Sequence, residues 1–396
     1  MTKGNTIESV RHADCCACFA CVNACPKGCI SMRTDESGSL YPFIDQEACV
    51  GCGKCLKSCP AARDVPRHEP LSIYAACNRD DELRGASTSG GVATTIANAI
   101  VAAGGVVYGA AMIGLEARHV RVDRPDEISR IQGSKYVHSH IRDACRLVKD
   151  DLASGARVAF FGTPCQVAGL IGYLGDVPEH LLLIDILCHG VVAHDCFVEG
   201  VRLEHSAIGE VANVTFRDGN RYCLKGYDAG GRVLFETPYR ASWLLNGFVE
   251  GLFFRENCYS CKFAGAKRCG DITLGDFWGL KSGFDTSKGV NFVAINTAKG
   301  HECWESIKGV LRYERHALEE AAPFNHPLRK PADKPAGYEK FKAIYALRGG
   351  RAALLHAYTS KVLFILLRRM ARRNRALYRV VTSVPVVGNK LKEYAE

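Results

Sequence analysis

The sequence predicts three parts in order: a small cysteine-rich α+β domain, a larger α/β domain with a mixed sheet, and a helical C-terminal tail. Two observations predict the first two parts. Cysteines are dense over residues 12–60 and recur there in two similar runs, whereas from Ser72 short apolar runs alternate with helical patterns. A third observation predicts the tail, because residues 351–396 are helical in pattern and carry ten Lys and Arg against two Glu.

The composition narrows the functional classes. The chain has 396 residues, of which 47% are hydrophobic and 23% charged, which excludes a wholly disordered, collagen-like or coiled-coil chain. The net charge is +9, and the tail holds +8 of it, so the body is near neutral. A nucleic-acid-binding protein usually carries its basic charge on the folded body, so we expect no nucleic-acid partner.

The chain contains 20 cysteines, which raises the question of disulfide bonds or metal. No apolar signal-peptide core stands at the N-terminus, and no apolar run reaches the roughly 18 residues of a spanning helix. We therefore expect a cytoplasmic protein. In that reducing compartment, cysteines at tight spacing bind metal more often than they form disulfides.

Two cysteine runs in the first part share one spacing, with gaps of two, two and three residues and a proline after the last cysteine. In two-cluster ferredoxins, three thiolates of one run and the fourth of the other hold each [4Fe-4S] cluster. Residues 1–64 are therefore predicted to form a ferredoxin-like two-cluster domain, with a zinc ribbon as the alternative. The predicted ligands are Cys15, Cys18, Cys21 and Cys59 for one cluster, and Cys49, Cys52, Cys55 and Cys25 for the other. Cys16 and Cys29 are expected to be free thiols.

Residues 61–71 resemble a linker, and the α/β pattern that follows is divided at 72–195 and 196–320. Strands are expected at 72–77, 105–112, 157–162 and 181–188, and helices at 92–103, 140–153, 164–174 and 193–205. Residues 211–237 contain Asp-Gly and Gly-Gly turns and predict short antiparallel strands. A strand at 290–296, a helix at 300–310 and a strand at 312–317 complete the pattern. The proline-rich residues 322–337 are expected to connect it to the tail.

Two loops have the residues of an anion-binding site. Hydroxyls and glycines of Ser87–Gly91 open a helix, whose free N–H groups and dipole can hold a phosphate. A purely structural helix cap is the alternative. Gly133–Tyr136 offers a cation and an aromatic ring, and here the alternative is an exposed loop.

Cysteines also follow two apolar strands, at the edge where ligands of parallel sheets bind. Thr163, Pro164 and Gln166 predict a capping box that places Cys165 in the first helical turn, where the dipole favours a thiolate. Cys188 and His189 end the next strand. The residues permit a Cys165 nucleophile with a His189 base, or a pair of metal ligands.

The spacing of Cys258 and Cys261 supplies half of a metal site. Together with Cys165 and Cys188 it would provide four thiolates for a third [4Fe-4S] cluster. Cys269 competes for one of these four ligand positions. The alternative for the pair of Cys258 and Cys261 is a zinc knuckle or a redox dithiol.

With these motifs the chain resembles, from Ser72 to about Leu318, the coenzyme F420 hydrogenase/dehydrogenase beta-subunit family. The resemblance rests on six segments in the expected order: Ser87–Gly91, Gly133–Tyr136, Gly162–Gln166, Cys188–Gly190, Cys258–Cys261 and Asp271–Gly279. Members are iron–sulfur flavoproteins that pass electrons between clusters and a two-electron partner, which is coenzyme F420 in archaeal members. Bacterial relatives with a fused ferredoxin domain lie near polysaccharide-assembly genes.

The resemblance implies that the α/β domain is a flavoprotein domain and assigns its site residues. Cys165, Cys188, Cys258 and Cys261 become the third cluster's ligands, and Asp276 and Trp278 would border the pocket. The implied FAD-binding residues are Ser87, Ser89, Gly90, Gly91, Lys135, Tyr136, Thr163 and Gln166.

The expected function is an iron–sulfur flavoprotein oxidoreductase that passes electrons between [4Fe-4S] clusters and FAD. Its two-electron partner would be coenzyme F420 or a polysaccharide-pathway intermediate, and its protein partner a redox protein or a hydrogenase/dehydrogenase subunit. The alternatives are a non-catalytic electron-transfer subunit and a Cys/His transferase with structural clusters. A flavin suits this role because it exchanges one or two electrons, whereas a cluster exchanges one.

The tail, residues 338–396, has an apolar half followed by a run of arginines from Arg368 to Arg379. Such a helix can lie on an anionic membrane surface, here the inner face of the membrane. A helix docked on the body or on a partner is the alternative.

Overall fold

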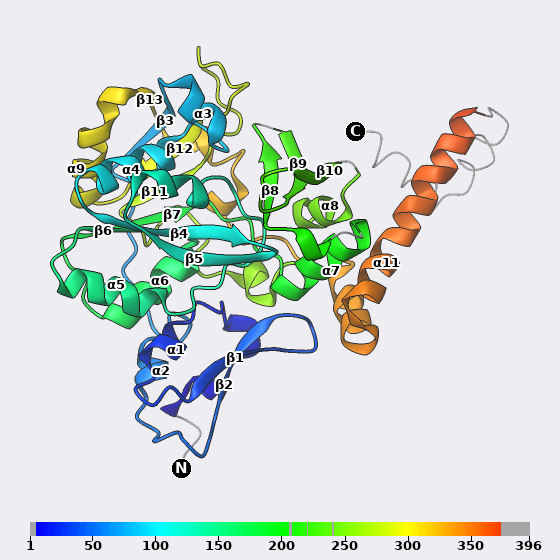
Figure 1. Cartoon of the computed structure of the whole chain (residues 1–396), viewed down its shortest axis with the longest axis horizontal. Coiled ribbons are helices and arrows are strands. Elements are labelled where there is room, and N and C mark those ends of the chain that lie inside the picture. The colour runs from blue at the N-terminus through cyan, green and yellow to red at the C-terminus, as the bar shows by residue number, and fades with distance from the viewer. Residues whose placement is uncertain (1–4, 206–207, 220, 240, 374–396) are drawn as a thin grey trace. The chain divides into compact units, whose positions relative to one another are not determined.

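The computed structural model describes residues 5–205, 208–219, 221–239 and 241–373, with side chains up to Ala357. The chain divides into two compact units, Met1–Pro335 and Ala336–Glu396. The first unit holds the cysteine-rich segment and both predicted parts of the α/β region (Figure 1).

The cysteine-rich segment forms two short helices and a two-stranded antiparallel sheet. A small apolar core of Ile7, Ile30 and Ile44 packs directly against cysteine side chains. So few apolar residues bury little surface, which fits a segment that metal stabilises. Its elements are η2 (Ile7–Ser9), η3 (His12–Asp14), α1 (Ala20–Ala24), β1 (Ile30–Thr34), β2 (Leu40–Ile44) and α2 (Lys54–Lys57).

An eight-stranded mixed sheet forms the centre of the unit, in the order β13-β3-β12-β11-β7-β6-β4-β5. The middle strands β4, β6, β7 and β11 are parallel, and the flanking strands pair antiparallel. The predicted mixed sheet is therefore confirmed. The strands are β3 (Ser72–Asn78), β4 (Val106–Ile113), β5 (Glu116–Val122), β6 (Val158–Gly162), β7 (Leu181–Ile186), β11 (Ile272–Asp276), β12 (Asn291–Ile295) and β13 (Leu311–His316).

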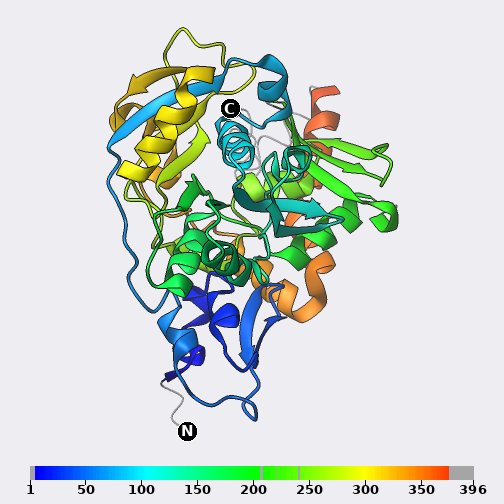
Figure 2. The same ribbon diagram turned by 60° about the vertical axis from the view of Figure 1, so that its left-hand side comes forward.

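Helices cover both faces of this sheet (Figures 1 and 2). α4 (Val92–Ala102) and α9 (Ala298–Ile307) pack on one face, and α5 (Ala144–Ala153) and α6 (Pro164–Leu174) on the other. Successive strand residues serve opposite faces, so Phe160 of β6 enters one core, whereas its neighbour Ala159 enters the other. Phe160 is fully buried.

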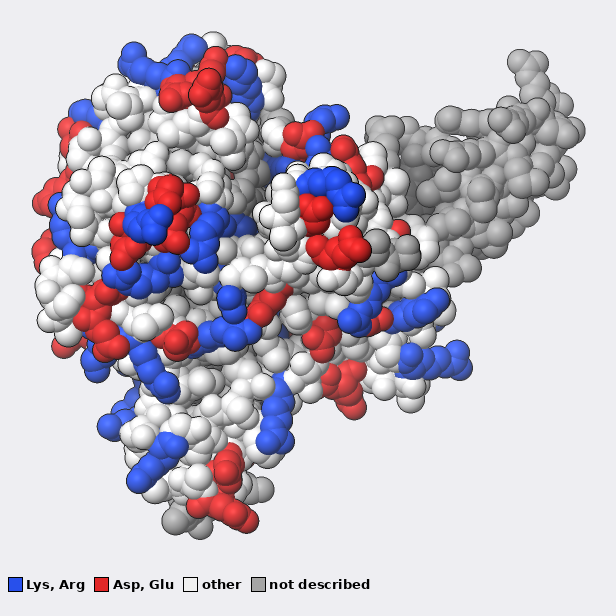
Figure 3. Space-filling view, in the orientation of Figure 1, with Lys and Arg blue, Asp and Glu red and all other residues white. Residues whose placement is uncertain are grey.

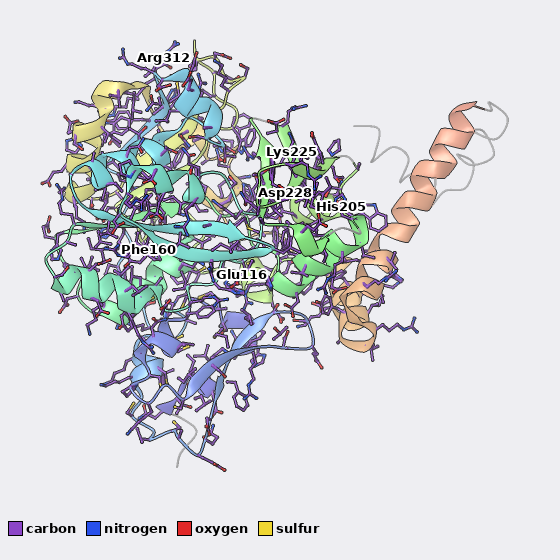
Figure 4. All side chains as sticks on the ribbon, viewed as in Figure 1. Glu116, Phe160, His205, Lys225, Asp228 and Arg312 are labelled. Carbon is purple, nitrogen blue, oxygen red and sulfur yellow. The ribbon has the colours of Figure 1, made fainter. Side chains whose placement is uncertain are left out.

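A smaller antiparallel sheet lies beside the first, as the Asp-Gly and Gly-Gly turns predicted. It has the order β10-β9-β8 and consists of β8 (Asn213–Asp218), β9 (Arg221–Tyr227) and β10 (Val233–Pro238). The helices α7 (His194–Glu204) and α8 (Trp243–Val249) pack together next to it. His205, which directly follows α7, joins that helix to the sheet by a hydrogen bond with Thr237 of β10 (Figure 4).

Two strands of the eight-stranded sheet were not predicted. β5 alternates apolar with charged residues and is an edge strand, and β11 is a five-residue strand inside a segment interpreted only as a motif. The helix predicted over 140–153 begins later, at Ala144, because Arg142 has a left-handed φ of 50°. The remaining short elements are α3 (Asp81–Ala86), η4 (Pro125–Ile131), η5 (Ile208–Glu210), η6 (Glu256–Ser260), η7 (Lys308–Val310), α10 (Leu318–Ala321) and η8 (His326–Leu328).

The second unit contains the long helix α11 (Tyr338–Arg373), interrupted at Gly349, whose φ is 79°. Within the described residues, no helix combines the length and the apolarity needed to cross a membrane. The arginine side chains of the predicted membrane-binding face lie outside the described side chains, so that face stays a prediction. On the visible face of the body, acidic and basic side chains are interspersed (Figure 3).

Candidate functional site

The first predicted cluster's cysteines come together beneath α6. Burial raises the pKa of Cys21, and the nearby Cys15 and Cys59 raise it further. Cys16 lowers the pKa of Cys18, but burial and the neighbours Cys59 and Cys21 raise it above its usual value. Without metal these thiols therefore stay protonated, and the irons of a cluster would supply the positive charge that stabilises them as thiolates.

The two cysteine loops repeat in backbone as well as in sequence. Ala17 and Phe19 have positive φ angles of 48° and 60°, and the equivalent Gly51 and Gly53 have 64° and 72°. A left-handed residue between successive cysteines turns the chain so that their side chains can point to one centre. The first loop does this without glycine, a strained arrangement of the kind that persists at functional sites.

The second predicted cluster's cysteines line a cavity of their own. Its walls include all four predicted ligands: Cys25, Cys49, Cys52 and Cys55. Cys29, expected to be a free thiol, also lines it, with its Sγ 3.3 Å from the Sγ of Cys25. Burial and the Cys25 thiol raise the pKa of Cys29 to about 12, so it is a neutral neighbour of this site.

The third predicted quartet comes together from three distant segments: the start of α6, the end of β7 and the η6 loop. Burial raises the pKa of Cys188 to about 12, with Cys165 and Cys261 adding to the shift. Burial raises the pKa of Cys258, and the nearby Cys188, Cys261 and Cys165 add to it. Burial and Cys165 likewise raise that of Cys261, to about 11, so every pair of the four thiols interacts.

Cys269 lies beside this group and stays a competitor for one ligand position. It is 4% exposed and belongs to the apolar core under α6, against which Cys165 and Cys261 also pack. Burial raises its pKa to about 12, and Asp185 and Cys165 add to the shift. Among the described residues, no three metal-ligating side chains converge on a point that one ion could occupy. A cubane places a different iron at each thiolate, so its ligands need not converge that tightly.

A buried ion pair braces the loop that follows the third quartet. Arg268 and Asp185 are 1% and 0% exposed in their side chains, and Arg268 Nη2 donates to Asp185 Oδ1 over 3.0 Å. The other carboxylate oxygen accepts from the Gly270 amide at 3.1 Å. The pair joins the loop to β7, the strand that leads to Cys188.

A cavity of about 310 Å³ opens at the carboxyl ends of the central strands. Ligand pockets typically span about 300–1,000 Å³. Seven of the eight residues predicted to bind the cofactor line it: Ser87, Ser89, Gly91, Lys135, Tyr136, Thr163 and Gln166. Cys188, His189, Asp276 and Trp278 line it as well.

Gly90 is the exception, and its role is packing. A Cβ on Gly90 would lie 2.3 Å from the Ala76 carbonyl oxygen and 2.8 Å from the Asn291 nitrogen. The residue therefore holds the loop against β3 and β12. Only glycine permits that approach.

The hydroxyls of the loop before α4 differ in what they contact. Ser87 Oγ donates to the Leu83 carbonyl oxygen over 2.9 Å, so it is already used. Ser89 is 8% exposed, and its Oγ is buried without a hydrogen-bond partner. Gly91 precedes the helix in a left-handed conformation and provides no side-chain cap, but Asn291 Oδ1 accepts from the Val92 amide at 3.1 Å. Ser89 is therefore the group best placed to serve a ligand.

Lys135, the predicted cation, does not offer an unpartnered amine to the cavity. Lys135 Nζ donates to three carbonyl oxygens of its own loop, those of Ile131, Gln132 and Gly133, over 2.7–3.1 Å. Burial lowers its pKa to about 7. Tyr136 stacks on Phe248, with ring centroids 4.4 Å apart.

Arg217 of β8 is a cavity residue that sequence reasoning missed. It donates to Tyr136 Oη at 2.5 Å, to Tyr222 Oη at 2.9 Å and to Asp276 Oδ2 at 2.7 Å. Its side chain is 7% exposed. No local pattern distinguishes an arginine in an alternating strand, because its partners come from distant segments.

The predicted capping box forms in part. The Thr163 amide donates to Gln166 Oε1 over 3.0 Å, and Gln166 Nε2 donates to the Ser139 carbonyl oxygen over 2.9 Å. The Thr163 hydroxyl instead lies 3.2 Å from Cys165 Sγ. Thr163 and Gln166 therefore line the cavity, but their polar groups already have partners within the protein.

The dipole of α6 does not by itself make Cys165 a thiolate, because neighbouring groups act in the opposite direction. The Cys16 thiol and burial raise the pKa of Cys165 well above its ordinary value. Burial lowers the pKa of His189, and its electrostatic neighbours are His326, Asp276 and Arg217 rather than Cys165. The structure therefore gives no support to a Cys165–His189 nucleophile pair.

Comparison with known proteins assigns family models to most of the chain. Two models describe the coenzyme F420 hydrogenase/dehydrogenase beta subunit: its N-terminal model matches residues 73–146, and its C-terminal model matches residues 155–320. Two models of a 4Fe-4S dicluster domain match residues 14–62 and 41–104.

Individual relatives agree with these assignments. An F(420)H(2) dehydrogenase subunit of Methanosarcina mazei is 25% identical over 222 residues, which are 53% of this chain and 62% of the relative. The chain thus spans less than two thirds of that protein. The ketoisovalerate oxidoreductase subunit VorC of Methanothermobacter marburgensis is 33% identical over 61 residues, which are 15% of this chain and 77% of VorC. A chain of the F420-reducing [NiFe] hydrogenase complex from Methanosarcina barkeri aligns with a TM-score of 0.47 and 19% identity, covering 71% of this chain and 91% of that one.

Proposed function

Because the chain belongs to the coenzyme F420 hydrogenase/dehydrogenase beta-subunit family and carries a 4Fe-4S dicluster domain, we propose that it is an iron–sulfur flavoprotein oxidoreductase. In this proposal, three thiol quartets hold [4Fe-4S] clusters, and the cavity at the sheet edge holds FAD. The clusters supply one-electron steps and the flavin converts them into a two-electron exchange with a substrate.

One observation carries the proposal: Cys188 belongs both to the third quartet and to the wall of the cavity. A cluster on that quartet would therefore border whatever occupies the cavity. On its other side, the third quartet approaches the dicluster domain, since Cys165 packs against the buried cluster of Cys16, Cys18 and Ala20. The three sites thus follow one another from the first quartet to the cavity.

Two glycines of α6 allow the first and third quartets to lie close together. A Cβ on Gly169 would lie 2.7 Å from Cys18 Sγ, and one on Gly172 would lie 2.3 Å from the Ser58 carbonyl oxygen. These α6 glycines let the dicluster domain approach the helix whose first turn carries Cys165. Close approach favours electron transfer between the two quartets.

The cavity residues suit a flavin nucleotide. The Val92 amide already donates to Asn291 Oδ1, so the unpartnered hydroxyl of Ser89 and the remaining N–H groups in the first turn of α4 can bind a phosphate. Tyr136 and Trp278 offer apolar surface to a ring system, and the buried ion pair of Arg217 and Asp276 lies at the same cavity.

Coenzyme F420 as the two-electron partner, and a hydrogenase or dehydrogenase subunit as the protein partner, are proposed because the relatives carry those names. The polysaccharide association and the membrane contact of the tail stay untested predictions. Truncation after Ala353 would abolish liposome binding if the tail provides that contact.

Analysis of anaerobically purified protein for iron, sulfide and flavin tests the proposal. We expect about twelve irons, at four per cubane, with one FAD per chain. About eight irons would remove the third cluster. Protein with a full iron content but no flavin, also after incubation with FAD, would favour the alternative of an electron-transfer subunit that feeds a separate enzyme.

A further inference from the structure

Arg255 is a buried arginine that connects the first and the third thiol quartets. Its Nη2 donates to the Cys15 carbonyl oxygen over 3.1 Å and to that of Leu40 over 2.9 Å. Its own carbonyl oxygen accepts from the Cys258 amide at 2.9 Å. One residue thus contacts the first ligand of one quartet through its side chain and a ligand of the other through its backbone.

The positive charge of Arg255 has no negative partner among the described residues. Arg255 is 2% exposed as a residue. Its guanidinium donates to carbonyl oxygens, and its Nε is buried without a partner. The Tyr41 ring lies 5.2 Å away. Arg268, the other fully buried arginine, differs because Asp185 pairs with it. An unpaired buried charge is costly, so a missing anion is to be expected at Arg255.

Both neighbouring quartets lie beside this charge, because Arg255 bonds the Cys15 carbonyl oxygen and the Cys258 amide bonds the Arg255 carbonyl oxygen. Among the described residues, no hydrogen bond joins Arg255 to a ligand of the second quartet.

We propose that Arg255 is the counter-cation shared by the clusters of the first and third quartets, and that its charge stabilises the reduced form of both. The proposal rests on the proposed function, which places [4Fe-4S] clusters on these thiols. Each cluster with four thiolates is an anion, and its reduction by an external one-electron donor adds one negative charge without forming or breaking a bond. A fixed cation between two such anions favours that added charge and limits the repulsion between them.

The test is a redox titration of the full-length, anaerobically loaded protein, followed by EPR. Arg255→Gln removes the charge but keeps an amide that can donate to the carbonyl oxygens. We expect the equilibrium constants for reducing the first and third clusters to fall about tenfold, which is about 59 mV for a one-electron couple. The second cluster is the internal reference and should be unchanged. Arg255→Lys, which retains the charge, should restore both values to within about threefold.

The proposal would be overturned if the equilibrium constants for reducing all three clusters were unchanged in fully loaded Arg255→Gln protein. An equal shift of all three constants would overturn it as well. If the Arg255→Gln protein does not retain iron, the Arg255→Lys variant is the deciding test. A tenfold fall in its equilibrium constants for cluster reduction, despite the retained positive charge, would contradict the role of Arg255 as a counter-cation. Failure of the proposed function is distinct, because wild-type protein would then lack the third EPR signal before any variant is compared.

Discussion

Cys258→Ala is expected to remove about four of about twelve irons while leaving the dicluster domain loaded. The Cys258 thiol interacts with all three other thiols of the third quartet. Loss of one of four thiolates exposes an iron, and the remaining three come from separate segments that lack a preformed loop. We expect reduction of the flavin by an external one-electron donor to fall to background.

The measurement is iron and sulfide analysis together with EPR of the reduced protein. Cys303→Ala is the matched control, because this thiol on α9 lies outside all three quartets and should cost no iron. An unchanged iron content in Cys258→Ala would show that the third ligand set is wrong. Loss of the dicluster signals would show that the cluster sites are not independent.

A paired substitution at Ser89 and Gly90 is expected to separate ligand binding from folding. Ser89→Ala removes a buried hydroxyl that has no protein partner, so the stability of the flavin-free protein should hardly change. If the hydroxyl bonds a charged phosphate, its loss should cost about 1.5–3 kcal/mol of binding, or roughly a tenfold to hundredfold weaker affinity for FAD.

Gly90→Ala should act in the opposite way. Its added methyl group would meet backbone atoms of β3 and β12 that cannot move aside, so we expect the free energy of unfolding to fall by about 1–3 kcal/mol or more. Gly85→Ala in α3 meets no atom within 4 Å and serves as the control. The measurements are thermal unfolding and FAD titration of the flavin-free protein. Unaltered FAD affinity in Ser89→Ala would remove the phosphate assignment.

Local signals were sufficient for many of the elements. The strand at β6 and the helix at α6 were predicted within one residue, because an apolar run, a threonine and a proline stand in the order that a strand-to-helix turn requires. The repeated cysteine spacing predicted which thiols share the second cavity. Both inferences depend on residues close together in the chain.

The features that were missed depend on distant residues. Arg217 reaches the cavity only because the small sheet packs beside the large one, and Arg255 matters because its side chain meets the Cys15 loop 240 residues earlier. Gly90 was predicted to bind the ligand, and its close packing against the carbonyl oxygen of Ala76 could not be predicted from neighbouring residues. Loops and caps can be predicted from their own residues, whereas burial and unpaired charge require the packed structure.

An anaerobic reductive titration tests the central claim most directly, because it counts the electrons that one chain accepts. Three clusters that take one electron each and a flavin that takes two predict about five electrons per chain, with the flavin absorbance bleaching during the titration. A chain that accepts about two electrons without a flavin signal would contain only the dicluster domain's clusters. That result would contradict the path from the thiol quartets to the cavity.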